Sequence, residues 1–450
     1  MKIVHLLGWY FPDSVGGTEV YVEGLCRRLR AAGHEVLIAA PDSRGLAAER
    51  YEHDGVPVFR YSIPAEPTRD EAYHRVPTRG AEKLYAWLER ERPDLLHVHS
   101  VTTGVGLPEL KAAARLNIRV IATCHLPGLG YMCRTGELMQ WGRFPCDGIV
   151  IPDKCAACSL TRLGLPEVVA RVVGAVPVSL SARLRVLPGR FGTSLGMSAS
   201  VVEYQGIQHE LLGLMEAFVV LNETARQMLI ADGAPVHKIV VNRLGISQTG
   251  IVRKPGPDRA PTGTPVRFGY LGRLNSVKGL MELARAVRAI PQDIPFELQI
   301  RGPQLDDAAR RFADELKATV GDDRRVRFEP AVPARDVPRV LADLDVLLCP
   351  SIWFENGPTI ALEAMAVGTP VIGSRVGNLA EIVNDGINGR LVAAGDVDAW
   401  KAALVDVASN PATTIDVWRR ALTDPRTMDD IARDYLDLYT APPLRCELRS

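Results

Sequence analysis

The stretch VRFGYLGRLNSVKGLMELARAVRAI, residues 266–290, changes from one kind of secondary structure to another near its centre. Its opening VRFGYLG is typical of a β-strand, and the residues from Ser276 onward place apolar side chains at helical spacing. Further strand candidates follow, FELQIRG, VRFEPA and VLLCPS, with predicted helices at residues 306–320, 337–344 and 358–366. Strands that alternate with helices predict a parallel sheet covered by helices on both faces.

The first half of the chain repeats this alternation. Its strand candidates are KIVHLLGWY, EVLIAAP, DLLHVHS and IRVIATCH, and its predicted helices cover residues 18–32, 80–92 and 107–116. Between the halves lies RKPGPDRAPTGTP, residues 253–265, whose proline, glycine and charge content suits an exposed linker. We therefore expect an α/β protein of two Rossmann-like, doubly wound domains that face an interdomain cleft, with ligands at the carboxyl ends of the strands.

The predicted domain borders follow from the same alternation. Residues 1–250 are expected to form the N-terminal domain, residues 251–265 the linker and residues 266–425 the C-terminal domain. Residues 426–450 are expected to form a C-terminal helix and tail, for which a return to the N-terminal domain is one option.

The composition of the chain narrows the class of protein. Its 450 residues suit two domains of roughly 200 residues each, and its 53 basic and 53 acidic residues balance, which argues against nucleic-acid binding. We find no apolar stretch of the roughly 18–20 residues that a membrane span needs, and the N-terminus does not resemble a secretory signal. We therefore expect a cytoplasmic protein with reduced thiols, and the inner face of the membrane is one option for its location.

Two glycine-containing turns are candidate phosphate sites. In GGTE, Gly16 and Gly17 follow the first strand and open a helix, where backbone N–H groups can meet an anion. This is neither a G-x-G-x-x-G fingerprint nor a Walker motif, so a plain tight turn is the alternative. In GRLNSVKG, Arg273 and Lys278 place two cations around a helix start, which suits a diphosphate; a solvated basic turn is the alternative.

A third stretch, SIWFENGPTIALEAMAVGTPVIGS, residues 351–374, holds two glutamates, Glu355 and Glu363, in an E-x7-E pattern. Together with GGTE and GRLNSVKG, it resembles the retaining glycosyltransferases of family 4, which have the GT-B architecture. The resemblance is strong over residues 266–392 and poor over residues 132–208.

The resemblance implies transfer of a hexose, with retention at the anomeric carbon, from a UDP- or GDP-sugar to a glycan, lipid-linked or small-molecule acceptor. It places the acceptor on the N-terminal domain and the donor on the C-terminal one. The implied catalytic residues are His125, Glu355, Arg273 and Lys278. The implied donor-binding residues are Gly16, Gly17, Arg273, Lys278, Asn356, Gly357, Pro358, Thr359 and Glu363.

Within that set, the resemblance assigns the ribose hydroxyls to Glu363 and the diphosphate to Arg273 and Lys278, so no catalytic divalent metal is expected. Leu126 stands where the family often has an aspartate, which leaves the role of that aspartate open here. The alternatives are a GT-B sugar-nucleotide epimerase or phosphorylase and a non-catalytic GT-B partner or regulatory protein.

A cysteine-rich insert, at about residues 130–160, departs from the family pattern. Its cysteines follow the spacing C-x12-C-x8-C-x2-C, and they are Cys133, Cys146, Cys155 and Cys158. In a reducing compartment this spacing predicts a structural metal, either zinc or a 4Fe-4S cluster, and free buried thiols or a disulfide pair are the alternatives. The remaining cysteines, Cys26, Cys124, Cys349 and Cys446, are expected to lie apart from the insert.

Two more features stay open at this point. Residues 177–197, PVSLSARLRVLPGRFGTSLGM, carry arginines among apolar residues, which suits peripheral contact with an anionic membrane; a partly buried loop or helix is the alternative. His97 and His99 alternate along one strand and so share a face, which lines either the cleft or the core.

Overall fold

The computed structural model describes residues 1–14, 16–44, 48–125, 133–246, 264–304 and 306–442. Leu126, Cys446 and most of the predicted linker lie outside these residues. The chain forms two compact units. Unit 1 contains Met1–Gly142, Cys146–Arg243 and the stretch that begins at Met428, and unit 2 contains Arg143–Pro145 and Leu244–Thr427.

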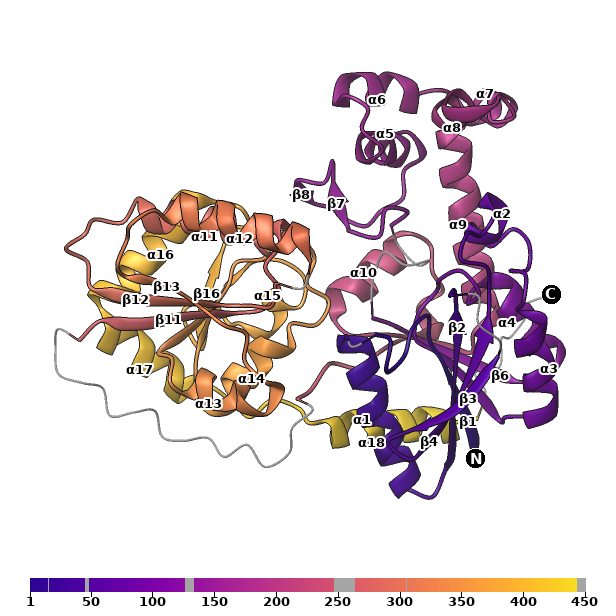
Figure 1. Ribbon diagram of the computed structural model, residues 1–450, viewed down its shortest axis with the longest axis horizontal. Helices are drawn as coiled ribbons and strands as arrows, with labels where there is room; N and C mark the ends of the chain where they lie inside the picture. Colours follow the sequence, from indigo (N-terminus) through magenta and orange to yellow (C-terminus); the bar gives the residue numbers. More distant parts are fainter. Residues whose placement is uncertain (15, 45–47, 126–132, 247–263, 305, 443–450) are drawn as a thin grey trace. The chain divides into compact units, whose positions relative to one another are not determined.

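Unit 1 is built on an eight-stranded sheet of order β10-β9-β6-β5-β1-β2-β4-β3. Figure 1 labels β1, β2, β3, β4 and β6 of this sheet. The strands are β1 (Lys2–Leu6), β2 (Glu35–Asp42), β3 (Glu49–His53), β4 (Val56–Ser62), β5 (Leu95–Val98), β6 (Arg119–Cys124), β9 (Ala217–Val220) and β10 (Ile239–Val241). All neighbours pair in parallel except β3 with β4. Strand order reverses between β1 and β5, so the loops after these strands diverge and leave room for a ligand.

Most helices of unit 1 follow or precede these strands. They are α1 (Gly17–Ala31), α2 (Arg69–Ala72), α3 (Glu82–Glu91), α4 (Leu107–Arg115), α10 (Glu223–Ala231) and the short 3-10 turn η1 (Val236–Lys238). The last helix, α18 (Met428–Thr440), packs against α1 of the same unit. Its Tyr435 accepts a hydrogen bond from Tyr21 at 3.2 Å, and Asp429 pairs with Arg28.

The middle of unit 1 carries a helical layer and the cysteine-rich segment. Its elements are β7 (Met139–Gln140), α5 (Pro152–Arg162), α6 (Glu167–Gly174), α7 (Val178–Leu184), α8 (Gly189–Leu195) and α9 (Met197–Leu214). The short strand β8 (Phe144–Pro145) falls within this stretch of the sequence but belongs to unit 2. The layer buries a small core of Ala156, Leu160, Ala170, Met197 and Val201. So small a core leaves many apolar side chains of these helices outside it.

Unit 2 is built on a six-stranded parallel sheet of order β13-β12-β11-β14-β15-β16. The strands are β11 (Val266–Leu271), β12 (Phe296–Arg301), β13 (Val326–Glu329), β14 (Val346–Cys349), β15 (Val371–Ser374) and β16 (Gly389–Val392). This order reverses between β11 and β14, as in a Rossmann sheet. The alternation of short apolar strands with helices therefore predicted the doubly wound class correctly.

Helices cover both faces of the unit 2 sheet. They are η2 (Ser276–Lys278), α11 (Leu280–Arg288), α12 (Asp307–Val320), η3 (Ala334–Asp336), α13 (Val337–Ala342), α14 (Thr359–Val367), α15 (Leu379–Ile382), α16 (Val397–Ser409) and α17 (Pro411–Ala421). One core packs α11, α12, α16 and α17 on one face, and a second packs α13 and α14 on the other. Two cores on one sheet explain why β14 is buried throughout.

None of the described helices is both long and apolar enough to cross a membrane. The predicted facing of the two units across a cleft stays a prediction.

Candidate functional site

A pocket of about 510 Å³ opens in unit 2 at the reversal point of the sheet. Its walls include the residues that follow β11 and β14, where a doubly wound sheet binds its ligand. Six of the residues predicted to hold the donor or to take part in catalysis line this pocket: Arg273, Lys278, Glu355, Gly357, Pro358 and Thr359. Asn356 and Glu363 are not among its lining residues.

An ion pair joins the two sides of this pocket. Lys278 Nζ lies 2.6 Å from Glu355 Oε1, and the Ser351 hydroxyl also donates a hydrogen bond to that oxygen. The ammonium also lies 5.4 Å from the ring centre of Trp353. Both charged side chains are largely buried, with 19% and 10% of their surface exposed, so water screens the pair only weakly.

A glycine makes this pairing possible. Gly279, directly after Lys278, adopts φ +68°, and a Cβ at this position would lie 1.8 Å from the carbonyl oxygen of Pro350. Only glycine allows the turn after β11 to lie this close to the end of β14. A backbone hydrogen bond from Ile352 N to Val277 O, 3.0 Å long, joins the same two segments.

Arg273 is the second cation of the pocket. It is exposed, and within the part of the chain that the structure describes its guanidinium makes no hydrogen bond or ion pair. Its backbone is fixed, because its carbonyl oxygen accepts a 2.8 Å hydrogen bond from the Tyr270 hydroxyl. Arg301 also lines the pocket and lies 4.0 Å from Glu329, so Arg273 is the unpaired cation among the described residues of the lining.

A tight turn at Gly377 and Asn378 packs against the loop between the two glutamates. Asn378 N donates a 2.7 Å hydrogen bond to the carbonyl oxygen of Glu355. Gly377 has φ +49°, and an added Cβ would lie 2.4 Å from that same oxygen. Asn356 is buried beside it. Pro358, which cannot donate a hydrogen bond, ends the loop and lets α14 begin at Thr359, so the positive end of the helix dipole lies at the pocket.

Glu363 lies in the second turn of α14 and is partly buried. Burial raises the pKa of its carboxyl to about 7. This carboxyl therefore holds its proton through much of the physiological pH range. A partner that donates hydrogen bonds to the carboxylate would favour release of the proton.

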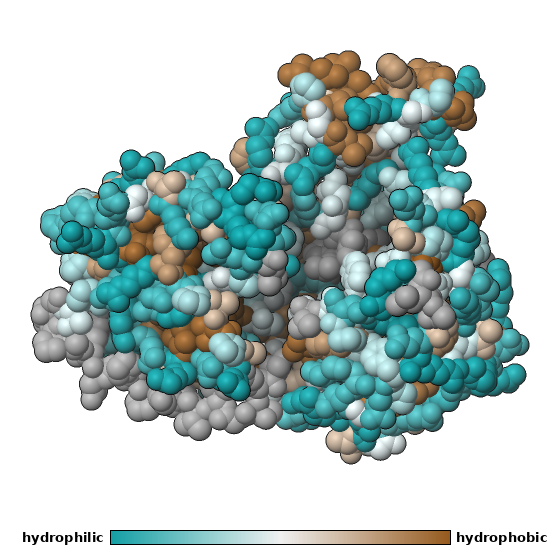
Figure 2. Space-filling model, viewed as in Figure 1, coloured by the Kyte–Doolittle hydropathy of each residue, from teal (hydrophilic) through white to brown (hydrophobic). Residues whose placement is uncertain are grey.

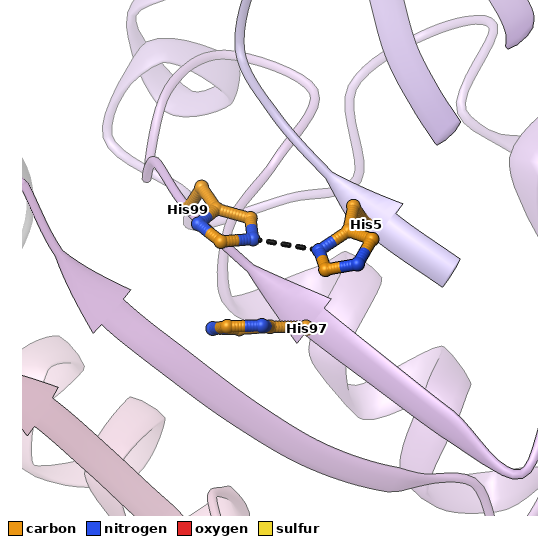
Figure 3. Close-up of side chains that lie close together, drawn as sticks. All are labelled: His5, His97 and His99. Atoms are coloured by element: carbon orange, nitrogen blue, oxygen red, sulfur yellow. Dashed lines mark hydrogen bonds between the residues drawn. The ribbon is translucent and has the colours of Figure 1, made fainter. Parts of the chain in front are cut away.

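In unit 1, the predicted histidine His125 follows β6 and ends a chain of hydrogen-bonded imidazoles. His5 Nδ1 lies 2.9 Å from His99 Nε2 (Figure 3). His99 Nδ1 in turn lies 3.0 Å from His125 Nε2. The ring of Tyr21, from α1, meets the His125 ring edge-on with 4.8 Å between centres. Burial lowers the pKa of both His5 and His125 to about 3, so these imidazoles are neutral.

The direction of the protons along this chain follows from its buried end. Within the described residues, His5 Nε2 is buried without a hydrogen-bond partner. At this position an unprotonated Nε2 costs less free energy than a buried Nε2–H without an acceptor. The proton of His5 therefore sits on Nδ1 and is donated to His99 Nε2. His99 then donates from Nδ1 to His125 Nε2, and His125 carries its own proton on Nδ1. The chain thus fixes the tautomer of His125.

His5, His97 and His99 also bring three ligand-type nitrogens within 4.8 Å of one another. Figure 3 shows the His97 ring lying beneath the hydrogen-bonded pair. His97 is held by the Thr123 hydroxyl at 2.7 Å and by the Tyr439 hydroxyl at 2.6 Å. Every nitrogen of His97 and His99 is therefore already hydrogen-bonded, which favours a structural chain over a metal site.

Gly16 and Gly17 lie at the start of α1, as Ncap and first residue of that helix. A Cβ on Gly16 would lie 2.7 Å from Glu19 Oε2, whereas one on Gly17 would meet nothing within 4 Å. Close packing thus explains only the first glycine. The predicted metal ligands Cys133, Cys146, Cys155 and Cys158 line one small cavity of the same unit.

Two family descriptions match the chain. Residues 15–174 match Glycosyltransferase Family 4, and residues 265–410 match Glycosyl transferases group 1. The chain belongs to glycosyltransferase family 4.

Two curated relatives show how far the likeness of this family 4 protein extends. D-inositol 3-phosphate glycosyltransferase from Corynebacterium urealyticum is 28% identical over 229 residues, which cover 49% of this chain and 52% of that protein. The amylovoran biosynthesis glycosyltransferase AmsK from Erwinia amylovora is 27% identical over 248 residues, which cover 52% of this chain and 59% of that protein. The family 4 protein thus spans little more than half the length of these relatives.

A solved structure shares the fold of the family 4 protein. Alr3699/HepE from Anabaena, in complex with UDP and glucose, matches 98% of this chain and 100% of its own with a TM-score of 0.60 and 14% sequence identity. At this identity the likeness concerns the fold alone. It confirms the predicted GT-B class.

Proposed function

We propose that this family 4 protein is a retaining hexosyltransferase, which moves a sugar from a UDP- or GDP-sugar to a glycan, lipid-linked or small-molecule acceptor. The observation that supports the proposal is the pocket of unit 2, where Arg273, Lys278 and Glu355 meet the start of α14. HepE, which shares the fold, binds UDP. UDP is therefore the first nucleotide to test.

The proposed role of the two cations is to stabilise the leaving group. When the sugar–oxygen bond breaks, negative charge grows on the nucleoside diphosphate. Arg273 and Lys278 line the pocket, and the dipole of α14 adds positive potential at Thr359. The proposal assigns charge neutralisation to these groups rather than to a divalent metal.

Glu355 would change partners during donor binding. It neutralises Lys278 in the ligand-free protein. A diphosphate carries more negative charge than one carboxylate, so we expect it to draw Lys278 away and to leave Glu355 for the hydroxyls of the donor sugar. Asn356 and Gly357 follow in the same loop, and Glu363 would accept hydrogen bonds from the ribose. His125, held neutral, would bind the sugar without adding charge.

The first test is thermal unfolding of the chain with UDP, GDP and ADP. We expect one nucleotide to raise the unfolding temperature by several degrees, because ligand at a hundred times its Kd stabilises by about 2.7 kcal/mol. Arg273→Gln should reduce this shift, since it removes the unpaired cation, whereas Arg288→Gln, on the exposed side of α11, should not. No shift with any nucleotide would contradict the proposal.

Turnover then separates the proposal from its alternatives. A transferase consumes the donor sugar fastest with an acceptor present, and the product keeps the anomeric configuration of the donor. An epimerase would change the donor without acceptor, and a phosphorylase would require inorganic phosphate. Nucleotide binding without turnover would indicate a partner protein.

We further propose that α6, α7 and α8 carry the protein to the cytoplasmic face of an anionic membrane, where a lipid-linked acceptor resides. Figure 2 shows apolar side chains gathered over these helices. Val186 and Phe191 are 80% and 77% exposed, and Val168 and Val172 are exposed to a similar degree. Residues 162–191 hold five arginines and a single acidic residue, so the charge of this surface complements anionic lipid.

Vesicle sedimentation tests this membrane contact. The chain should sediment with vesicles of phosphatidylglycerol and phosphatidylcholine, and less with phosphatidylcholine alone. Val186→Ser with Phe191→Ser should weaken binding at least about tenfold, since each buried apolar side chain contributes about 1.5–3 kcal/mol. Val236→Ser, an exposed valine of η1, is the matched control. Equal sedimentation of the double variant would contradict the proposal.

A further inference from the structure

Four cysteines surround one cavity of unit 1. Cys133 and Cys146 come from the segment before α5, and Cys155 and Cys158 from α5 itself. The cavity has a volume of about 30 Å³, which exceeds the ~10–15 Å³ that a single water needs. All four cysteines are free thiols of intermediate exposure. The C-x2-C pair within one helix and two loop cysteines thus converge on a common space.

The walls of this cavity are mainly apolar and partly fixed by hydrogen bonds. Leu138, Met139, Ile149 and Val150 line it together with the sulfurs. Trp141 N donates a 3.3 Å hydrogen bond to Cys158 Sγ.

The spacing of the sulfurs distinguishes between two occupants. In a single zinc site each Zn–S distance is about 2.3 Å, which places the four sulfurs within about 4 Å of one another. Among the described residues, the group of three or more ligand atoms within 4.8 Å is the histidine set, and no three of these sulfurs form one. An iron–sulfur cluster puts its own core between the thiolates, each bound to a different iron, and so holds them further apart.

A partly buried cation beside the cavity suits an anionic occupant. Arg134 lines the cavity, and its guanidinium donates to the carbonyl oxygen of Ser200 at 3.0 Å and to the hydroxyl of Tyr73 at 2.8 Å. Neither acceptor is charged, and the described residues provide Arg134 with no carboxylate partner. A buried unpaired charge is costly unless an opposite charge offsets it.

We propose that Cys133, Cys146, Cys155 and Cys158 bind a 4Fe-4S cluster. A finished 4Fe-4S cluster is transferred from a carrier: each thiol releases its proton to solvent and its sulfur forms one bond to one iron, while the carrier's thiolate leaves that iron and takes up a proton. No electron is gained or lost in this step. Four thiolates on a core of charge 2+ leave a net charge of 2−, which Arg134 partly offsets. The cluster holds the segment before α5 against that helix.

The test is the iron, acid-labile sulfide and zinc content of the full chain, purified without oxygen. We expect about four irons and four sulfides per chain, with visible absorption that bleaches on reduction. Cys155→Ser with Cys158→Ser should lose both, whereas Cys26→Ala, a buried thiol of α1, should keep them.

Several results would overturn the proposal. These are one zinc per chain without sulfide, a metal-free protein in which the four thiols of the insert are free to react, or iron that survives in the double variant. The content of the unchanged chain decides between cluster and zinc even where the double variant fails to fold.

Discussion

Glu363→Gln should abolish most of the nucleotide affinity and at the same time make the protein more stable at alkaline pH. The affinity falls because a carboxylate that accepts hydrogen bonds from two ribose hydroxyls is replaced by a neutral amide; loss of a hydrogen bond to a charged group costs about 1.5–3 kcal/mol, or roughly 10- to 150-fold in Kd. Calorimetric titration with the nucleotide that passes the thermal test measures this change.

The gain in stability follows from the raised pKa of Glu363. Its carboxyl has a pKa of about 7 in the folded protein, against an ordinary value near 4.5. Between these values the folded chain binds more protons than the unfolded chain, so stability falls as pH rises through this window. The full difference is worth up to about 3 kcal/mol above pH 7. Glu363→Gln removes this cost, so its unfolding temperature should exceed that of the parent chain at pH 8 and match it at pH 4.5.

The same titration couples nucleotide binding to pH. Binding favours the carboxylate, so the affinity of the parent chain should rise between pH 6 and pH 8, beyond any change due to the nucleotide itself. The pH dependence of affinity in Glu363→Gln measures the part that comes from titration of the nucleotide itself. Glu315→Gln, an exposed glutamate of α12, should keep the behaviour of the parent chain. An identical pH dependence in parent and Glu363→Gln would show that this carboxyl does not meet the ribose.

Local motifs account for the predicted donor-site residues that the structure brings together around one pocket. Arg273 and Lys278 lie within one turn, and Glu355 to Thr359 within one loop, so short-range spacing placed them at the ends of β11 and β14. The strand alternation then made these two ends neighbours. The direct pairing of Lys278 with Glu355 was not predicted, because it depends on the approach of Gly279 to Pro350.

The histidine chain shows the limit of such reasoning. His97 and His99 were seen to share a face of one strand, but His5 and Tyr439 were missed. His5 meets them through the pairing of β1 with β5, in which His5 lies opposite His97. Tyr439 arrives from α18, more than three hundred positions away along the chain. Repeated histidines at the same register of two neighbouring strands were the available signal for His5, and nothing local pointed to Tyr439.

For the cysteine-rich insert, too, the sequence predicted one part of the site and left another part open. Spacing alone predicted that four cysteines share one site, and the structure places all four around one cavity. It left zinc and a cluster open, because the choice depends on distances between sulfurs rather than on their order. The apolar residues at 177–197 were ambiguous because a helix that mixes apolar and basic residues can be either buried or exposed. In the structure the core shared by α5 to α9 is small, and many of these apolar side chains are exposed.

Lys278→Met should lower both stability and activity, and a second substitution should separate the two effects. Removal of the ammonium leaves Glu355 largely buried with Ser351 as its remaining partner here. Breaking a buried ion pair from one side typically costs about 3–5 kcal/mol, so we expect a marked fall in unfolding temperature. Loss of a preorganised cation at the leaving group should also reduce kcat by about 10²- to 10³-fold.

Lys278→Met combined with Glu355→Gln tests the cause. The neutral pair leaves no charge unpaired, so stability should recover by at least about 2 kcal/mol relative to Lys278→Met alone, as a double-mutant cycle measures. Activity should stay low, because neither the diphosphate nor the sugar regains its partner. Lys317→Met, in an exposed pair with Asp314, should change stability by less than about 1 kcal/mol and leave activity intact. If the double variant recovered activity along with stability, Lys278 would serve only to neutralise Glu355, and the diphosphate would depend on Arg273 and the start of α14.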